Sequence, residues 1–124
     1  MTTQSHSIRI LIVDDHTIVR RGLKALLAEI EDMQVVGEAD NGLEAVRLSR
    51  LLEPDVILMD LLMPKMDGME ATRQILGQQP HMRVLVMTSF VHDDKIIPAI
   101  KAGASGFVLK ESEPEELIRS IHKA

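Results

Sequence analysis

The sequence contains no cysteine, tryptophan or tyrosine, and it has only two phenylalanines among its 124 residues. The absence of cysteine excludes disulfides and thiolate chemistry, and it agrees with a reducing compartment. So few aromatic side chains offer little surface for stacking nucleic-acid bases. The net charge of −5 also opposes binding to phosphate backbones. We therefore do not expect this segment to bind nucleic acid directly.

The chain also lacks an apolar run long enough to cross a bilayer. Residues 1–7 are polar and lack the basic-then-apolar pattern of a signal peptide, so they are expected to be a flexible N-terminus. These features predict a cytoplasmic protein without a membrane partner. The hydrophobic fraction of 45% and the charged fraction of 27% are typical of a globular domain, expected here over residues 8–124.

Five short apolar runs alternate with five helical patterns along the chain. The expected strands cover residues 8–13, 34–39, 55–60, 83–88 and 106–109, and the first helix is expected over about 17–31. Strands joined through helices form right-handed crossovers, so the sheet should be parallel with helices on both faces. The predicted fold class is therefore α/β, a flavodoxin-like three-layer sandwich with strand order 2-1-3-4-5.

Three helices carry more specific expectations. The fourth helix, capped by Asp93 or Asp94, should be the least stable, because Pro98 lies inside it and lacks a hydrogen-bond donor. Residues 112–115 have the pattern of a capping box at the start of the fifth helix. The second helix is expected to place Leu43, Val46 and either Leu51 or Leu52 on its inner face, and the fourth helix bears the helically spaced Ile96, Ile97 and Ile100.

Polar side chains stand where the buried strands end. Asp14 and Asp15 follow the first strand, Asp60 ends the third, and Thr88 and Lys110 end the fourth and follow the fifth. In this strand order, the ligand crevice lies outside the carboxyl ends of the first and third strands. Three carboxylates in one crevice repel one another, so the site should attract a cation. Ligands that are all oxygens suit Mg²⁺.

These five residues, with 63–64 and 67–68 in the loop after the third strand, resemble the receiver domain of two-component response regulators. The resemblance covers nearly the whole chain. Three longer segments look like the NarL/FixJ (LuxR-type) branch of that family: residues 15–23, 36–42 and 101–107. Residues 88–91 and 98–100 are similar to regulators of cell-envelope stress.

The resemblance implies a role for each site residue. Asp60 would accept a phosphoryl group from a sensor histidine kinase or a small phosphodonor. Mg²⁺ would be bound directly by Asp15, Asp60 and the backbone carbonyl of Leu62, and through water by Asp14. Lys110 would offset the developing negative charge. His16, although it adjoins the acidic pair, is interpreted as a helix-start residue and not as a ligand.

The resemblance also implies a switch. Thr88 would move toward the phosphoryl group and leave space for Phe107, after which the domain would form a homodimer through its fifth helix with the first or fourth. Leu62 and Phe90 stand two residues after Asp60 and Thr88, where family members control the access of water. Both are apolar, so a fairly long-lived phosphorylated state is expected.

The resemblance further implies a transcription regulator that is not an enzyme, with DNA bound only by a separate C-terminal helix-turn-helix domain. A stand-alone receiver that acts by protein contact or phosphorelay is the alternative. A flavodoxin-like electron carrier is disfavoured because Asp14 and Asp15 would repel the flavin phosphate. A phosphatase with an aspartate nucleophile needs a second acid where Leu62 stands.

Overall fold

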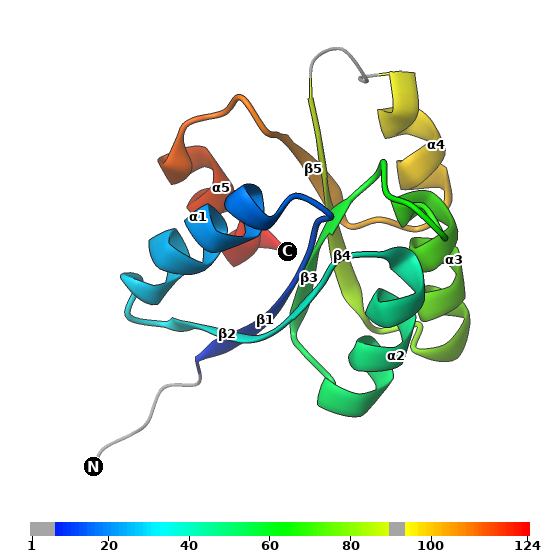
Figure 1. Cartoon of the computed structure of the whole chain (residues 1–124), viewed down its shortest axis with the longest axis horizontal. Coiled ribbons are helices and arrows are strands. Elements are labelled where there is room, and N and C mark those ends of the chain that lie inside the picture. Colours follow the sequence, from blue (N-terminus) through cyan, green and yellow to red (C-terminus); the bar gives the residue numbers. More distant parts are fainter. Residues whose placement is uncertain (1–6, 90–93) are drawn as a thin grey trace.

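The computed structural model describes residues 7–89 and 94–124, in which five strands alternate with five helices (Figure 1). In chain order the elements are β1 (Ile8–Val13), α1 (Thr17–Ala28), β2 (Met33–Ala39), α2 (Gly42–Leu52), β3 (Val56–Asp60), α3 (Gly68–Gln78), β4 (Arg83–Thr88), α4 (Ile96–Lys101), β5 (Gly106–Leu109) and α5 (Pro114–Lys123). All strand pairs are parallel and their order is β2-β1-β3-β4-β5. The predicted fold class and strand order are confirmed.

The sheet forms the middle of three layers, with β3 at its centre. Helices α1 and α5 cover one face, and α2, α3 and α4 cover the other (Figure 1). Alternate residues of β3 serve the two faces: Ile57 and Met59 pack toward α2 and α3, whereas Val56 and Leu58 pack toward α1 and α5. Because every residue of β3 is buried, its last residue, Asp60, is buried as well.

The inner faces of α2 and α4 differ from the prediction. Leu43 is 53% exposed, because α2 begins at Gly42 and its buried stripe runs through Ala45, Val46 and Ser49. Ile97 and Ile100 are also exposed, and Ala99 is the buried residue of α4. The small side chain of Ala99 lets a six-residue helix lie close to its neighbours, while the larger side chains point outward.

The helix ends also differ from the prediction. Pro98 is the third residue of α4, in the first turn, where its missing N–H has no intrahelical partner to lose. Lys95, rather than Asp94, stands at the cap of α4. The capping box at residues 112–115 is not formed, because Glu113 is the cap of α5 and Pro114 its first residue. Helix α1 ends at Ala28, earlier than expected.

Some expectations fall on residues outside the described ranges. The flexible N-terminus predicted over residues 1–7 lies there except for Ser7, and so do Phe90 and Asp93. Within the described ranges, no helix combines the length and the apolar character needed to cross a membrane.

Candidate phosphoacceptor and metal site

The carboxyl ends of β1 and β3 bring the acidic residues together. The backbone N–H of Asp14 continues the β1 ladder by donating to the carbonyl of Ala39 at 3.0 Å. Asp60 is the last residue of β3 and pairs with Met87 of β4. Both aspartates are almost completely buried, with exposures of 0% for Asp14 and 3% for Asp60. Two buried carboxylates beside each other are unfavourable unless positive charge compensates them.

The loop after β3 is held by two glycines, and this fixes the backbone at Asp60. The N–H of Gly68 donates to the carbonyl of Leu61 at 2.9 Å, and the N–H of Gly42 donates to that of Met66 at 3.0 Å. A Cβ atom on Gly68 would lie 2.1 Å from the carbonyl oxygen of Asp60. At Gly42 a Cβ would lie 2.3 Å from the oxygen of Met66. The loop therefore needs glycine at both positions to pack as it does.

Lys110 supplies the compensating charge in the pocket. Its ammonium lies 3.1 Å from Asp14 Oδ2 and 3.1 Å from Asp60 Oδ1. Burial lowers the pKa of Lys110, but the attraction of Asp60 and Asp14 outweighs it and raises the pKa overall. Lys110 is therefore a permanent cation in this pocket. One ammonium still leaves an excess of negative charge beside Asp14, Asp15 and Asp60.

Asp60 is the perturbed carboxyl of the pocket. Burial and the neighbouring charge of Asp14 raise its pKa to about 6, although Lys110 and the backbone N–H of Leu62 oppose the shift. Its second oxygen, Oδ2, is buried and has no hydrogen-bond partner among the described residues. A buried carboxylate oxygen without a partner is suited to a metal ion or to a reacting group. The donor set of Asp14, Asp15 and Asp60 therefore fits a dication.

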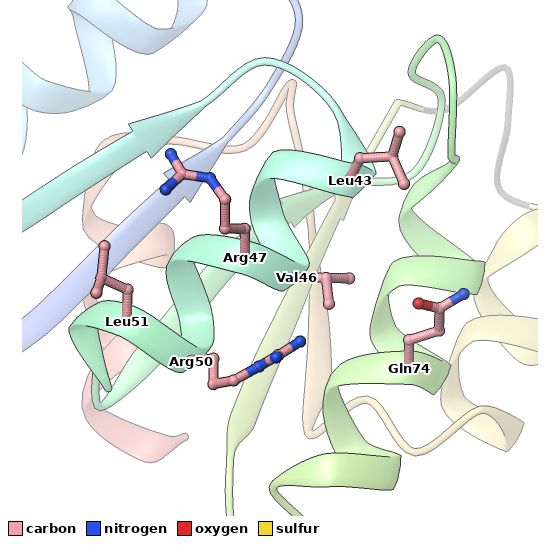
Figure 2. A pocket seen from close by; sticks show the side chains of 6 residues that line it. All are labelled: Leu43, Val46, Arg47, Arg50, Leu51 and Gln74. Atoms are coloured by element: carbon pink, nitrogen blue, oxygen red, sulfur yellow. The ribbon is translucent and has the colours of Figure 1, made fainter.

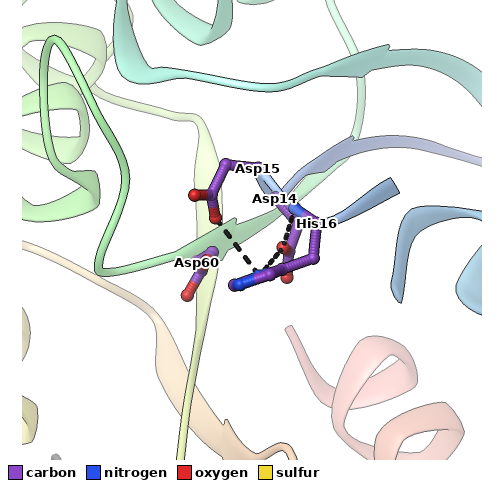
Figure 3. A group of neighbouring side chains, drawn as sticks. All are labelled: Asp14, Asp15, His16 and Asp60. Carbon is purple, nitrogen blue, oxygen red and sulfur yellow. Dashed lines mark hydrogen bonds and ion pairs between the residues drawn. The ribbon is translucent and has the colours of Figure 1, made fainter. Parts of the chain in front are cut away.

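The ring of His16 also belongs to the cluster, although the sequence interpretation gave His16 only the role of a helix-start residue. It is the cap residue of α1, as expected, but its side chain does not cap the helix. Its Nδ1 lies 3.0 Å from Asp14 Oδ1 and 3.3 Å from Asp15 Oδ1 (Figure 3). Atoms of Asp14, Asp15, His16 and Asp60 that can bind a metal all lie within 4.8 Å of one another. The position of His16 directly after Asp14 and Asp15 was the feature of the sequence that could have indicated this contact.

Thr88 ends β4, the strand next to β3, whereas Phe107 lies on β5 and pairs with Val86, two residues before Thr88. Thr88 is buried at the end of β4, and its carbonyl accepts a hydrogen bond of 2.7 Å from the N–H of Lys110. Phe107 on β5 is 45% exposed, so it lies outside the core. Leu62, two residues after Asp60, is 41% exposed. Thr88, at the end of β4, and Lys110, directly after β5, are thus joined through the backbone.

Arg20 positions the loop between β1 and α1, and sequence reasoning assigned it no role. Its Nη1 donates to the backbone carbonyl of Asp14 at 2.7 Å, and its Nε donates to Glu38 Oε1 at 3.3 Å. Lys24 lies 3.2 Å from the other oxygen of Glu38. An arginine one turn into a helix that follows a strand-end aspartate could have indicated this contact. The pair of Arg20 and Glu38 ties the acidic loop to β2.

A second hollow lies on the surface formed by α2 and α3 (Figure 2). Its lining combines two leucines, a valine, two arginines and a glutamine: Leu43, Val46, Arg47, Arg50, Leu51 and Gln74. None of these six side chains is a carboxylate or a nucleophile. This hollow therefore offers neither a site for a hard cation nor a phosphoryl acceptor, and the acidic pocket is the candidate functional site.

Comparison with known families and proteins gives a consistent result. The family model described as the response regulator receiver domain matches residues 10–122. The transcriptional regulatory protein LiaR of Bacillus subtilis is 50% identical over 117 residues, which are 94% of this chain and 56% of LiaR. The nitrate/nitrite response regulator protein NarL of Escherichia coli is 40% identical over 115 residues, covering 93% of this chain and 53% of NarL. The chain thus spans about half the length of these relatives.

Solved structures agree in fold and in family. A LuxR-family two-component response regulator from Aurantimonas sp. superimposes with a TM-score of 0.89 and 41% identity, over 94% of this chain and 84% of that one. The response regulator domain of CheB from Thermotoga maritima gives 0.88 and 35%, over 96% of both chains. The resemblance to receivers, and to the NarL and LuxR branch of them, is confirmed.

Proposed function

Because the chain belongs to the response regulator receiver domain family, we propose that it is a phosphorylation-activated switch in which Asp60 accepts a phosphoryl group from a sensor histidine kinase. One observation carries this proposal. Of the two buried carboxylates that contact Lys110, Asp60 is the one whose pKa is raised, and its Oδ2 has no hydrogen-bond partner among the described residues. A carboxylate oxygen that is ionised and free of hydrogen bonds is a competent nucleophile.

Mg²⁺ is the proposed cofactor, since the donor set fits a hard dication. Asp15, Asp60 and the backbone carbonyl of Leu62 would bind it directly, and Asp14 would act through a water molecule. Three carboxylates and one ammonium leave a formal charge of about −2, which a dication neutralises. When bound, Mg²⁺ supplies electrostatic stabilisation of the transferring phosphoryl oxygens.

The residues of the chain itself have separate roles in the transfer. The Asp60 carboxylate attacks phosphorus as the bond to the donor breaks, so its negative charge passes to the phosphoryl oxygens. Lys110, already 3.1 Å from Asp60 Oδ1, is placed to pair with those oxygens. Thr88 would donate to another of them. The domain catalyses only its own phosphorylation and dephosphorylation, so we do not class it as an enzyme.

The switch is energetically feasible. Hydrogen bonds to charged groups contribute roughly 1.5–3 kcal/mol each, so Thr88 and Lys110 together offer about 3–6 kcal/mol. A shift in population from 1:99 to 99:1 needs about 5.5 kcal/mol. The exposed ring of Phe107 would then move inward, into the space that Thr88 vacates. This would remodel the surface formed by α4, β5 and α5.

The remodelled surface is proposed to form a homodimer through α5, with either α4 or α1 beside it. Ile97 and Phe107 expose apolar area on the α4 side, whereas Ile18 is 84% exposed on α1. Sedimentation with and without beryllofluoride, a phosphoryl mimic, tests the dimer. Ile97→Glu and Ile18→Glu then distinguish the two arrangements, because only the variant in the true interface should remain monomeric. A wild-type monomer under both conditions at high concentration would exclude the dimer.

The output is proposed to be control of transcription in the cytoplasm, through a helix-turn-helix domain C-terminal to residues 8–124. Support comes from relatives named as transcriptional regulators, of which this chain spans about half. A stand-alone receiver that acts by protein contact or phosphorelay is the second candidate. The full-length open reading frame distinguishes the two.

Mass spectrometry after incubation with acetyl phosphate and Mg²⁺ tests the phosphoacceptor. We expect an adduct of about 80 Da, the mass of one phosphoryl group, on the peptide that contains Asp60. Asp60→Asn should lose the adduct, and Asp55→Asn should keep it, since Asp55 is exposed and directly precedes the opposite end of the same strand. A stable adduct on Asp60→Asn would assign the phosphoacceptor to another residue.

A further inference from the structure

The ring of His16 lies directly against two carboxylates of the pocket. Its Nδ1 is 3.0 Å from Asp14 Oδ1 and 3.3 Å from Asp15 Oδ1. The backbone N–H of His16 also donates to Asp14 Oδ1, at 2.8 Å, which fixes the start of α1 over the acidic pair. A ring nitrogen this close to carboxylate oxygens needs a positive centre between them. That centre is either a proton or a metal ion.

The separations match those between ligands of a single metal ion. Two ligands each about 2.1 Å from an ion lie about 3.0 Å apart at a right angle and about 3.4 Å apart at the tetrahedral angle. The contacts from His16 Nδ1 to Asp14 and Asp15 fall at these edge lengths. The whole cluster spans 4.8 Å, so an ion would have to draw the outermost pair of ligands together.

The hydrogen bonding of Asp60 also points to a ligand in this cluster. Asp60 Oδ2 is buried in the same cluster and has no hydrogen-bond partner among the described residues. The side chain of His16 is 62% exposed, so an ion could reach the cluster from solvent. In Figure 3 the four side chains converge from the ends of β1 and β3 and from the first turn before α1.

We propose that His16 Nδ1, with Asp14, Asp15 and Asp60, forms a four-ligand Zn²⁺ site that competes with Mg²⁺. The proposal rests on the proposed function, in which the same pocket holds the Mg²⁺ used for phosphorylation. Imidazole is a favourable ligand for Zn²⁺, whereas Mg²⁺ prefers oxygen ligands and retains water. The nitrogen adds no charge, so it changes metal preference through the type of donor alone.

Occupation by Zn²⁺ would inhibit phosphorylation for a geometric reason. Zn²⁺ bound by four protein ligands is a closed tetrahedral site with no open position for a phosphoryl oxygen. Zn²⁺ would take Asp60 Oδ2 as its ligand, so this oxygen would no longer be available as the nucleophile, whereas Mg²⁺ bound through the other oxygen of Asp60 would leave Oδ2 free. Zn²⁺ would thus hold the domain in its unphosphorylated state.

Direct measurement of metal binding tests the proposal. Calorimetry compares the Zn²⁺ and Mg²⁺ affinities of the wild type, His16→Gln and the control His122→Gln. The imidazole of His122 lies on α5 and pairs with Asp32 instead of the acidic cluster. His16→Gln should lower the ratio of Zn²⁺ to Mg²⁺ affinity by at least about tenfold, since loss of even an indirect metal contact costs 10–100-fold. His122→Gln should leave the ratio unchanged.

Imidazole ¹⁵N spectra provide a second readout that does not depend on phosphorylation. Zn²⁺ should shift the Nδ1 resonance of His16, and Mg²⁺ should not. An unshifted His16 resonance, or an unchanged affinity ratio in His16→Gln, would overturn the proposal. Failure of Asp60 to become phosphorylated with Mg²⁺ would instead contradict the proposed function, and it would leave the Zn²⁺ measurements interpretable.

Discussion

Lys110 Nζ lies 3.1 Å from Asp60 Oδ1, yet the pKa of Asp60 is still raised to about 6. Burial at the end of a central strand is the largest cause of the shift, and the charge of Asp14 adds to it. The negative charge of the pocket is therefore only partly compensated, even with a lysine in contact. This excess of negative charge suits the pocket to a dication, and the predictions for Asp60 and Lys110 follow from it.

Asp60→Asn should stabilise the metal-free protein at neutral pH. In the unfolded chain the carboxyl titrates near 3.8, whereas in the folded protein its pKa is about 6. Below about pH 3.8 the group is protonated in both states and contributes nothing. As the pH rises through 6 the folded state comes to carry the full cost of the buried charge, about 3 kcal/mol for this shift. The gain in the variant should therefore be at most about 3 kcal/mol.

Urea denaturation in the presence of EDTA at several pH values measures this effect. The stability difference between Asp60→Asn and the wild type should be largest above pH 6 and should shrink toward pH 4. Asp55→Asn serves as the control, since Asp55 is exposed directly before β3 and the asparagine oxygen can still accept the hydrogen bond that Arg9 N–H donates to Asp55 Oδ2. A difference that grows as the pH falls would contradict the raised pKa of Asp60.

Lys110→Ala should bind Mg²⁺ at least as well as the wild type but fail to switch. Removing the ammonium raises the pKa of Asp60 further and leaves Asp14 and Asp60 without their cation, so the metal-free protein should lose stability. Mg²⁺ no longer competes with a resident positive charge, so its affinity should rise. Calorimetric titration measures the affinity, and sedimentation with beryllofluoride should show no dimer. Arg50→Ala removes an exposed positive charge on α2, outside the proposed dimer surface, and should behave as the wild type.

Gly68→Ala should disrupt the site through the backbone. The added Cβ would lie 2.1 Å from the carbonyl oxygen of Asp60, so either the loop or Asp60 has to move. We expect a loss of stability of about 1–3 kcal/mol, typical of overpacking, together with weaker Mg²⁺ binding. Gly77→Ala is the matched control in the same helix, because nothing lies within 4 Å of its added Cβ. It should stabilise α3 by about 0.5–1 kcal/mol. Thermal unfolding of both variants measures the contrast.

The sequence predicted the strands because they depend on short-range patterns, and it predicted the acidic edge because the strand order follows from the alternation of strands and helices. Apolar runs such as Val56–Met59 are typical of strands buried on both faces, and topology alone brings Asp14 and Asp60 to one crevice. What periodicity could not predict was the direction of single side chains. His16 follows the acidic pair, but its ring direction depends on how α1 begins.

The exposure of Phe107 shows a second limit of sequence patterns. Val108 packs toward α5, so the alternation of the strand directs Phe107 to the face covered by α4. That helix has six residues and buries only Ala99, which leaves the ring 45% exposed. Hydrophobicity alone would place a phenylalanine in the core. Phe107 instead lies on the edge strand β5 beside a short helix, and no local pattern around Phe107 indicates either feature.

Dephosphorylation of Asp60 should be slow, because the flanking side chains cannot activate water. Leu62 lies two residues beyond Asp60 and is 41% exposed at the rim of the site. It offers neither a donor nor an acceptor to a water molecule that approaches phosphorus. Phe90, outside the described residues, stands at the other position that the family resemblance assigns to this control. An apolar pair at these two positions leaves the attacking water without a general base.

Phe90→Glu should therefore accelerate dephosphorylation by at least about tenfold, a modest part of the 10²–10⁴-fold that a well-placed general base contributes. The carboxylate would accept a hydrogen bond from water and orient it toward phosphorus. The rate is measured by loss of the 80 Da adduct over time, after removal of acetyl phosphate with Mg²⁺ still present. Leu51→Glu adds the same charge on the exposed face of α2, away from Asp60, and should leave the rate as in the wild type. An equal rate in Phe90→Glu and the wild type would remove Phe90 from this role and leave Leu62 as the residue to substitute next.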